Sequence, residues 1–265
     1  MAMTRTVVIT GAGTGIGEAC ARQLAGEGAN LVLIGRRAEP LQRVAEETGG
    51  LVLVGDAASS ETWAGFIGRI RERFGGVDAL LACAGGHGLG SVTDTDDATW
   101  QAALRSNLDS AFYSARACLP LLIERRGGIV LLGSIASLAA GPEVCGYTTA
   151  KHALLGLNRS LANDYGAVGV RVNCVCPGWV RTPMADAEMQ PLMQHHGDDL
   201  DAAYARVCAN VPLRRPATPD EIANVCRFLI SDLASIITGA CIVADGGSSI
   251  VDVPTLAFAN MGITT

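Results

Sequence analysis

Short runs of apolar residues alternate along this chain with longer segments in which apolar residues recur at helical spacing. The short runs predict strands over residues 6–10, 31–34, 51–54, 79–83, 129–132, 170–175 and 240–244. The longer segments predict helices over residues 18–27, 41–48, 61–74, 99–125, 147–165 and 220–229. The strand runs are continuously apolar, which is typical of parallel strands covered by helices on both faces. We therefore predict an α/β fold with a doubly wound, seven-stranded parallel sheet in three layers.

No linker or low-complexity segment divides the 265 residues, so we expect one domain over residues 1–265. The longest departure from the alternation is residues 183–212, which are rich in Met, His and Asp. We expect this segment to be a lid over a ligand site. Residues 248–265 form a tail with many apolar side chains. Because a wet apolar tail is unfavourable, we expect it to pack across a subunit boundary.

Composition and charge exclude several classes of partner. The chain has 20 basic and 26 acidic residues, a net charge of −6, and no basic cluster of the kind that binds nucleic acid or anionic lipid. The longest uncharged stretch, residues 127–142, is shorter than the roughly 20 apolar residues that span a bilayer. The first residues lack the order of a secretory signal, so we expect a cytoplasmic protein. Nine scattered cysteines without metal-ligand spacing predict reduced core thiols and no metal site.

A glycine-rich loop follows the first predicted strand and leads directly into a helix. Glycine occupies positions 11, 15 and 17 of this loop. These glycines allow a tight turn, close approach to a pyrophosphate, and a helix N-terminus that faces the anion. Such a loop can also be a simple flexible turn, but its place between strand and helix favours a dinucleotide site in a Rossmann-like fold.

The residues after the second and third predicted strands bear on which dinucleotide binds. NAD-selective folds usually carry an acid after the second strand for the ribose 2′-hydroxyl, whereas this chain has Arg36 and Arg37. Guanidinium groups bind a 2′-phosphate, so the pattern favours NADP(H); NAD(H) stays open if both arginines are merely solvated. Asp56 is expected either to accept a hydrogen bond from the adenine amino group or to cap the helix that begins near Ser59.

Lys151 is the one lysine of the chain and follows Tyr147 by one helical turn. This spacing places both side chains on one helix face. A nearby ammonium stabilises a phenolate, so the pair is suited to general acid and base chemistry. An incidental pair on an exposed face is the alternative.

Together these motifs resemble the short-chain dehydrogenase/reductase family, in its short, single-domain branch. The resemblance covers nearly the whole chain and includes the glycine loop, the tyrosine and lysine of a Y-x-x-x-K motif, an upstream serine, Pro177-Gly178 with Thr182, and the terminal Asp245-Gly246-Gly247. The longer gap between tyrosine and lysine of related enoyl reductases is absent.

The resemblance implies roles for the matching residues. Tyr147 would be the acid or base, Lys151 would bond the nicotinamide ribose, Ser134 would hold the substrate oxygen, and the backbone carbonyl of Asn107 would anchor a relay water. The alternatives are a plain strand-end turn at Ser134 and a helix-bonded side chain at Asn107. With Tyr147 and Lys151, the implied cofactor contacts are Gly11, Thr14, Gly15, Ile16, Arg36, Arg37, Asp56, Ala57, Ala84, Gly85, Pro177, Gly178, Val180 and Thr182.

One loop departs from the family pattern. The usual N-N-A-G after the fourth strand is replaced by Ala82, Cys83, Ala84 and Gly85, so side-chain hydrogen bonds near the adenine ribose are lost. Backbone contacts at Ala84 and Gly85 remain available.

The substrate pocket is expected beside Ser134 and Tyr147, with residues 87–89 and the lid contributing to its walls. Val144 and Trp179 are further candidates to contact substrate. Glu143 either lies at the pocket lip, where it would suit an amine or a polyol, or faces solvent.

The resemblance implies a homotetrameric oxidoreductase that moves a hydride between NADP(H) and a ketone/secondary alcohol pair. One alternative is an NAD(H)-dependent dehydrogenase of secondary alcohols, including amino alcohols and polyols; another is a 3-oxoacyl thioester reductase. A non-catalytic, dinucleotide-sensing scaffold would keep the glycine loop without needing Asn107, Ser134, Tyr147 and Lys151 together. All four are present.

Overall fold

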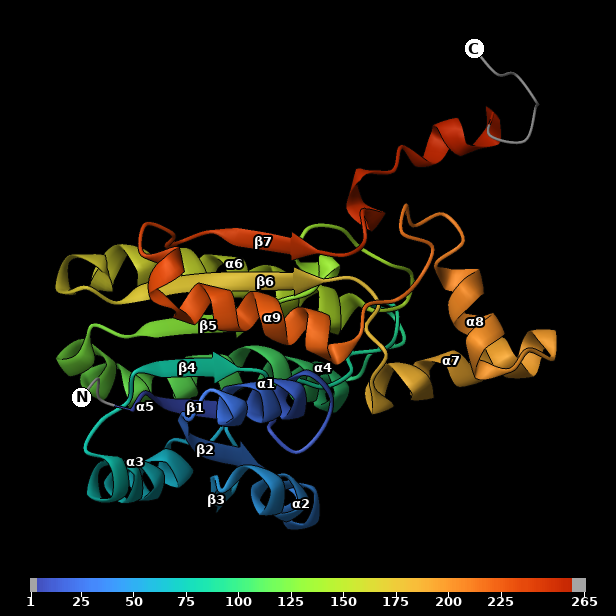
Figure 1. Cartoon of the computed structure of the whole chain (residues 1–265). Coiled ribbons are helices and arrows are strands. Elements are labelled where there is room, and N and C mark those ends of the chain that lie inside the picture. Colours follow the sequence, from blue (N-terminus) through green and yellow to red (C-terminus); the bar gives the residue numbers. More distant parts are fainter. Residues whose placement is uncertain (1–3, 259–265) are drawn as a thin grey trace.

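A computed structural model describes residues 4–258 of the chain. Its seven parallel strands form one sheet in the order β3-β2-β1-β4-β5-β6-β7 (Figure 1). The strands are β1 (Thr6–Thr10), β2 (Asn30–Gly35), β3 (Leu51–Val54), β4 (Ala79–Ala82), β5 (Gly128–Leu132), β6 (Arg171–Pro177) and β7 (Cys241–Ala244). The strand order reverses direction between β1 and β4, which pair directly. The predicted doubly wound, Rossmann-like sheet is confirmed, and the reversal point is where such sheets bind ligands.

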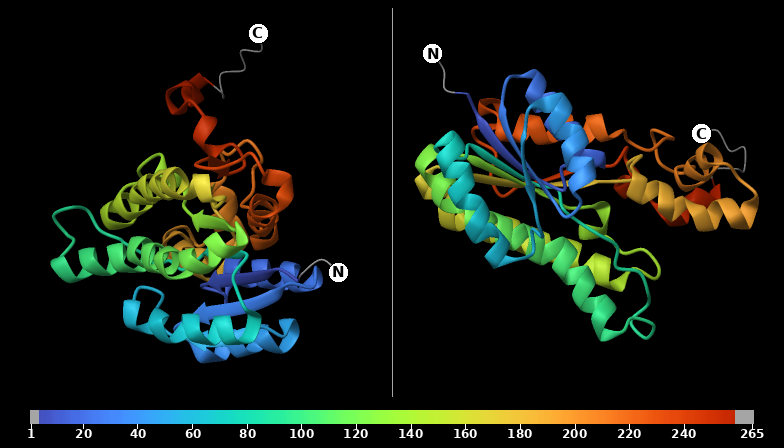
Figure 2. Two further views of the ribbon diagram at one scale, coloured as in Figure 1. Left: turned by 90° about the vertical axis from the view of Figure 1, so that its left-hand side faces the viewer. Right: turned by 90° about the horizontal axis from the view of Figure 1, so that it is seen from below.

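The helices connect successive strands and cover both faces of the sheet, which gives three layers (Figure 2). They are α1 (Gly15–Gly26), α2 (Ala38–Thr48), α3 (Ser60–Phe74), α4 (Asp97–Leu104), α5 (Ser110–Arg125), α6 (Cys145–Tyr165), α7 (Pro183–His196), α8 (Leu200–Val207) and α9 (Pro219–Ile230). None of the helices within residues 4–258 combines the length and apolarity that crossing a bilayer requires.

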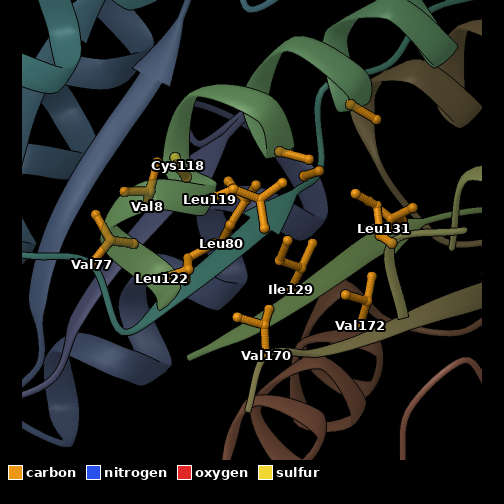
Figure 3. Packing of buried hydrophobic residues seen from close by; sticks show 14 of the residues in the cluster. Val8, Val77, Leu80, Cys118, Leu119, Leu122, Ile129, Leu131, Val170 and Val172 are labelled. Atoms are coloured by element: carbon orange, nitrogen blue, oxygen red, sulfur yellow. The ribbon is translucent and has the colours of Figure 1, made fainter. Parts of the chain in front are cut away.

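Each strand supplies side chains to two separate cores, because successive residues point to opposite faces. In β1, Val7 and Ile9 pack with α1, α2 and α9, whereas Val8 packs with α3, α5 and α6. Figure 3 shows the second core, where Val8, Leu80, Ile129 and Val172 come from neighbouring strands and Leu119 and Leu122 come from α5. Burial on both faces explains why the strand sequences are continuously apolar.

The predicted single helix over residues 99–125 is wrong in one respect. The segment begins at Asp97, and a π-helical turn at Arg105–Asp109 separates α4 from α5. Apolar spacing does not reveal this wider turn, because a π turn inserts one residue without interrupting the helix. The turn is significant because it carries Asn107.

Residues 183–212, predicted as a lid, are largely helical. Thr182 caps α7, followed by Pro183 at the first helical position, a strong start signal. A small core of Ala185, Met189, Ala203 and Tyr204 joins α7 to α8. Both helices lie beyond the carboxyl ends of the strands (Figure 1).

Residues 248–258 of the C-terminal tail extend away from the sheet (Figure 1). Between residues 248 and 258 it forms two short 3₁₀ segments, and Ile250, Val253 and Phe258 are exposed. Residues 259–265 of the predicted tail lie outside the described residues.

All nine cysteines are free thiols in the structure. Six are buried, as expected for core residues, whereas Cys83, Cys145 and Cys241 are half-buried.

Candidate active site

Two adjoining cavities open at the carboxyl edge of the sheet. The first, of about 590 Å³, is lined by Ser134, Tyr147 and Lys151, among others. The second, of about 500 Å³, is lined by Gly35, Arg36 and Asp56, among others. Gly11 and Gly85 line both cavities, so the glycine loop and the loop after β4 lie where the two meet. An elongated ligand with two different ends fits this arrangement.

The glycine loop needs its glycines for conformation and for space. Gly11 and Gly15 have positive φ angles of +66° and +58°, which residues with a Cβ rarely adopt. A Cβ on Gly17 would lie 2.4 Å from the Gly11 carbonyl oxygen, and one on Gly11 would lie 2.9 Å from the Cys83 carbonyl oxygen. The loop therefore packs backbone against backbone and presents the N-terminus of α1 to the cavity, a cradle that fits a pyrophosphate.

Lys151 and Tyr147 face each other from α6 into the first cavity. The Lys151 ammonium is 5.5 Å from the centre of the Tyr147 ring, and its Nζ donates a hydrogen bond to the Leu132 carbonyl oxygen at 2.8 Å. Lys151 is only 4% exposed. The alternative of an incidental exposed pair is therefore wrong for Lys151, since its charged group is enclosed by the site.

Ser134 lies just beyond β5 in the wall of the same cavity. Its hydroxyl accepts a hydrogen bond from the Ala136 N–H at 3.1 Å and caps the short 3₁₀ turn Ile135–Ser137. The structural and the catalytic interpretations are compatible, because the hydroxyl proton remains available to a ligand oxygen while the oxygen accepts from Ala136.

Asn107 is buried at the π turn, and its side chain is fully engaged. Its Oδ1 accepts from the Gly86 N–H at 3.2 Å, and its Nδ2 donates to the carbonyl oxygens of Gly86 at 3.1 Å and Ala103 at 2.9 Å. The bond to Ala103 is the bond within the helix that one alternative for Asn107 expected. The two bonds to Gly86 in addition fix the loop after β4 against α4 and α5.

The unusual sequence of the loop after β4 has a structural explanation. Cys83 is half-buried and packs against the core that contains Val7 and Ile9, where its thiol interacts with that of Cys20. The Ala84 N–H donates to the Thr10 hydroxyl at 3.1 Å. The loop is thus anchored by its backbone to β1 and to Asn107, without the asparagines of the family pattern.

The second cavity places Arg36 and Arg37 at its rim, where both side chains are exposed. Ala57 and Ala84 also line this cavity. Within residues 4–258 neither arginine forms an ion pair. Two guanidinium groups without an ion-pair partner in this part of the chain are therefore available to an anionic ligand at this end.

Asp56 also lines the second cavity, but it does not cap α3 as one alternative expected. Ser59 caps that helix itself by accepting from the Thr62 N–H. Partial burial opposes ionisation of Asp56, but hydrogen bonds from the Ala58 N–H and the Arg105 guanidinium outweigh it and lower the pKa of the carboxyl. The ion pair with Arg105, at 2.7 Å, was not indicated by the sequence, because the two residues belong to different elements.

The end of β6 and the segment after it also line the first cavity. Pro177, Gly178, Val180 and Thr182 line it together with Ile16 and Thr14 of the glycine loop. A Cβ on Gly15 would lie 3.1 Å from the Thr182 side chain, so this segment packs directly on the glycine loop. The implied nicotinamide contacts are therefore adjacent in space.

Among the expected substrate contacts, Val144 and Trp179 line the first cavity, whereas Glu143 does not. Glu143 is exposed and has a φ of 55°, which turns the chain just before α6. The Glu143 side chain is thus exposed and does not line the cavity, although its neighbours Pro142 and Val144 do. The carboxylate that does line the cavity is Glu188 of α7, whose Oε1 lies 2.9 Å from Nδ1 of His87.

Comparisons with known proteins identify the family of the chain. The sequence model of a family described as enoyl-(acyl carrier protein) reductase matches residues 11–249. Protein MoaE of Klebsiella aerogenes is 55% identical over 97% of this chain and 100% of its own length. The meso-2,3-butanediol dehydrogenase of Serratia marcescens is 35% identical over 94% of this chain and 96% of its own length. The chain belongs to the short-chain dehydrogenase/reductase family.

A solved structure of the family shows the same architecture. The L-sorbose reductase of Gluconobacter frateurii, in complex with NADPH and L-sorbose, matches with a TM-score of 0.86 and 30% identity, over 93% of this chain and 98% of that chain. Relatives in this family are oxidoreductases of CH–OH groups that use nicotinamide dinucleotides. The present chain is such an enzyme.

The close packing of Gly17 against Gly11 should make cofactor binding sensitive to a side chain at position 17. Gly17→Ala should weaken NADPH binding by about tenfold or more, because the new Cβ must displace the Gly11 carbonyl that shapes the cradle. Fluorescence titration with NADPH, alongside thermal unfolding, measures the effect. Gly26→Ala in the same helix is the matched control, since no atom lies within 4 Å of its new Cβ. Wild-type affinity in Gly17→Ala would show that the loop does not hold the cofactor.

Proposed function

We propose that this enzyme interconverts a ketone and a secondary alcohol with NADP(H) as the hydride carrier and Tyr147 as the acid or base. The observation that supports this most strongly is the enclosed Lys151 ammonium beside Tyr147 in the cavity that Ser134 also lines. The glycine loop lines both cavities, which together leave room for the dinucleotide next to these groups. When bound, the nicotinamide supplies or accepts the hydride.

The proton is handled by residues of the chain. In the direction of reduction, the Tyr147 hydroxyl donates its proton to the carbonyl oxygen as that oxygen gains negative charge, and Lys151 stabilises the phenolate that results. The Ser134 hydroxyl donates a hydrogen bond to the same oxygen and stabilises its developing charge. In the direction of oxidation, the same groups act in reverse. Asn107 would place its backbone carbonyl near Lys151 for a relay of protons to solvent.

The proposed preference for NADP(H) is supported by charge. Arg36 and Arg37 are exposed at the rim of the second cavity, and neither forms an ion pair within residues 4–258, although the charge of Asp56 acts on Arg36 from a distance. A 2′-phosphate at that rim would form charge-assisted hydrogen bonds with them. The similar L-sorbose reductase was solved with NADPH, which is consistent with this proposal.

The proposed assembly is a homotetramer that acts in the cytoplasm on small molecules, without nucleic acid or membrane partners. The exposed apolar residues Ile250, Val253 and Phe258 support the assembly, because a monomer would leave them in water.

Reduction of an enoyl group is not favoured. Tyr147 and Lys151 lie one helical turn apart on α6, whereas related enoyl reductases have a longer gap between these two residues.

A second prediction concerns the acid and base. Tyr147→Phe should lower the rate of ketone reduction by about 10²–10⁴-fold, because the variant has no proton to transfer. Its affinity for NADPH should stay within about twofold, since the ring still packs beside Lys151. Loss of NADPH absorbance over a panel of ketones measures the rate. Tyr165→Phe, at the far end of the same helix, is the control and should be fully active. Undiminished turnover by Tyr147→Phe would refute the assignment.

A third prediction concerns cofactor choice. The wild-type enzyme should prefer NADPH to NADH in kcat/KM, and Arg36→Ala with Arg37→Ala should reduce that preference by about tenfold, or roughly 1.4 kcal/mol. NADH kinetics should hardly change, because the 2′-hydroxyl carries no charge. Arg69→Ala, an exposed arginine on α3, is the control. A wild-type preference for NADH would overturn the role given to both arginines.

A fourth prediction concerns the tail. Deletion of residues 251–265 should convert a tetramer into smaller species in light scattering, because the apolar contacts across the subunit boundary would be lost. The truncation point preserves the turn in which Asp245 accepts from the N–H groups of Gly247 and Ser249. An identical mass for the full-length and truncated proteins would contradict the proposal.

A further inference from the structure

The first cavity has mostly apolar walls and a single acidic group. Ile135, Ala139, Val144, Trp179 and Met184 form much of the wall near Ser134. Of the side chains that line this cavity between residues 4 and 258, Glu188 is the one carboxylate. His87 is its partner, with a separation of 2.9 Å between Nδ1 and Oε1. The proposed hydride transfer assigns no role to this pair.

His87 is fixed in place by its two neighbours in the chain. Gly86 is held by the side chain of Asn107 through both its N–H and its carbonyl. The Gly88 carbonyl accepts from the Tyr147 N–H at 3.2 Å, and a Cβ on Gly88 would lie 2.4 Å from that nitrogen. The backbone of His87 therefore lies between two residues that contact Asn107 and Tyr147. The imidazole itself is oriented by Glu188.

Glu188 reaches this imidazole from α7, on the other side of the cavity. With a neutral ring, the Nδ1–H donates to Oε1, and the negative charge of the carboxylate is retained. Glu188 Oε2 has no hydrogen-bond or ion-pair partner in the described part of the chain. The side chains are 46% and 32% exposed for His87 and Glu188, so a ligand in the cavity can reach the free oxygen.

We infer that Glu188, oriented by His87, binds the ammonium group of an amino alcohol or amino ketone substrate. A carboxylate with one free oxygen forms a strong, charge-assisted hydrogen bond with an ammonium. The indole of Trp179 in the same wall also favours a cation. A polyol would require several polar groups along the wall, and the wall is apolar. An anionic substrate would be repelled. This inference rests on the proposed function and names its substrate class.

Pairs of secondary alcohols that differ only in charge test the inference. Oxidation of 1-amino-2-propanol is compared with that of 2-butanol, and oxidation of 4-amino-2-butanol with that of 2-pentanol, with NADP⁺ as the oxidant. The wild-type enzyme should favour the better amino alcohol over its neutral counterpart by about tenfold or more in kcat/KM. In Glu188→Gln this preference should fall at least about fivefold, while the kcat/KM of the neutral alcohols is retained. Oxidation of 3-hydroxybutanoate should improve.

The matched control is Asp186→Asn, which removes a carboxylate from the same helix. Asp186 accepts from the Tyr204 hydroxyl at 2.8 Å and does not line the cavity, so the preference should be unchanged. Equal turnover of charged and neutral alcohols by the wild type would overturn the inference, as would an equal loss for both in Glu188→Gln. Either result leaves the proposed function standing, because neutral alcohols are still oxidised. Failure to oxidise or reduce any substrate with either cofactor would instead overturn the proposed function.

Discussion

The buried ammonium of Lys151 is the constraint on which the site depends. A charged group that is only 4% exposed is unfavourable unless nearby dipoles or charges compensate it. Within residues 4–258 Lys151 has no acidic partner, and its neighbours are the Leu132 carbonyl oxygen and the face of the Tyr147 ring. No carboxylate in this part of the chain neutralises its charge, so the ammonium is available to stabilise a phenolate at Tyr147. The hydrogen bond to Leu132 also ties α6 to the end of β5, two residues before Ser134.

A second set of contacts completes the frame. Asn107 holds Gly86, and Tyr147 holds Gly88 through its backbone N–H, so the loop after β4 is fixed to both α4–α5 and α6. The sheet places all of these groups at one edge, because parallel strands end together at their carboxyl side. The π turn that carries Asn107 is thus part of the geometry of the site rather than a distortion of a helix.

The sequence was sufficient for features that arise from local spacing. Continuous apolar runs predicted the strands, and the position of the glycine loop between strand and helix predicted the cradle. The spacing of Tyr147 and Lys151 placed both on one face of a helix. Each of these follows from steric or periodic rules that operate over a few residues.

Features that depend on contacts between distant segments were not predictable in this way. His87 and Glu188 are 101 residues apart, and Asp56 and Arg105 are 49 residues apart. Which carboxylate reaches the pocket is decided by the packing of α7 and by the turn at Glu143, and neither leaves a periodic signal. The π turn is equally silent: Ser106, Asn107 and Asp109 weaken a helix in general, but their presence does not distinguish a π turn from a helix end or a loop.

The most direct test is a double-mutant cycle on Tyr147 and Lys151, which face each other across 5.5 Å. The rate of ketone reduction at saturating NADPH is compared in the wild type, Tyr147→Phe, Lys151→Met and the variant that carries both changes. Because the ammonium acts through the phenol, Lys151→Met should slow the wild type by about tenfold or more but should slow Tyr147→Phe by less than about twofold. An equal loss from Lys151→Met in both backgrounds would show that the ammonium does not act through Tyr147, and the proposed acid and base chemistry would fail.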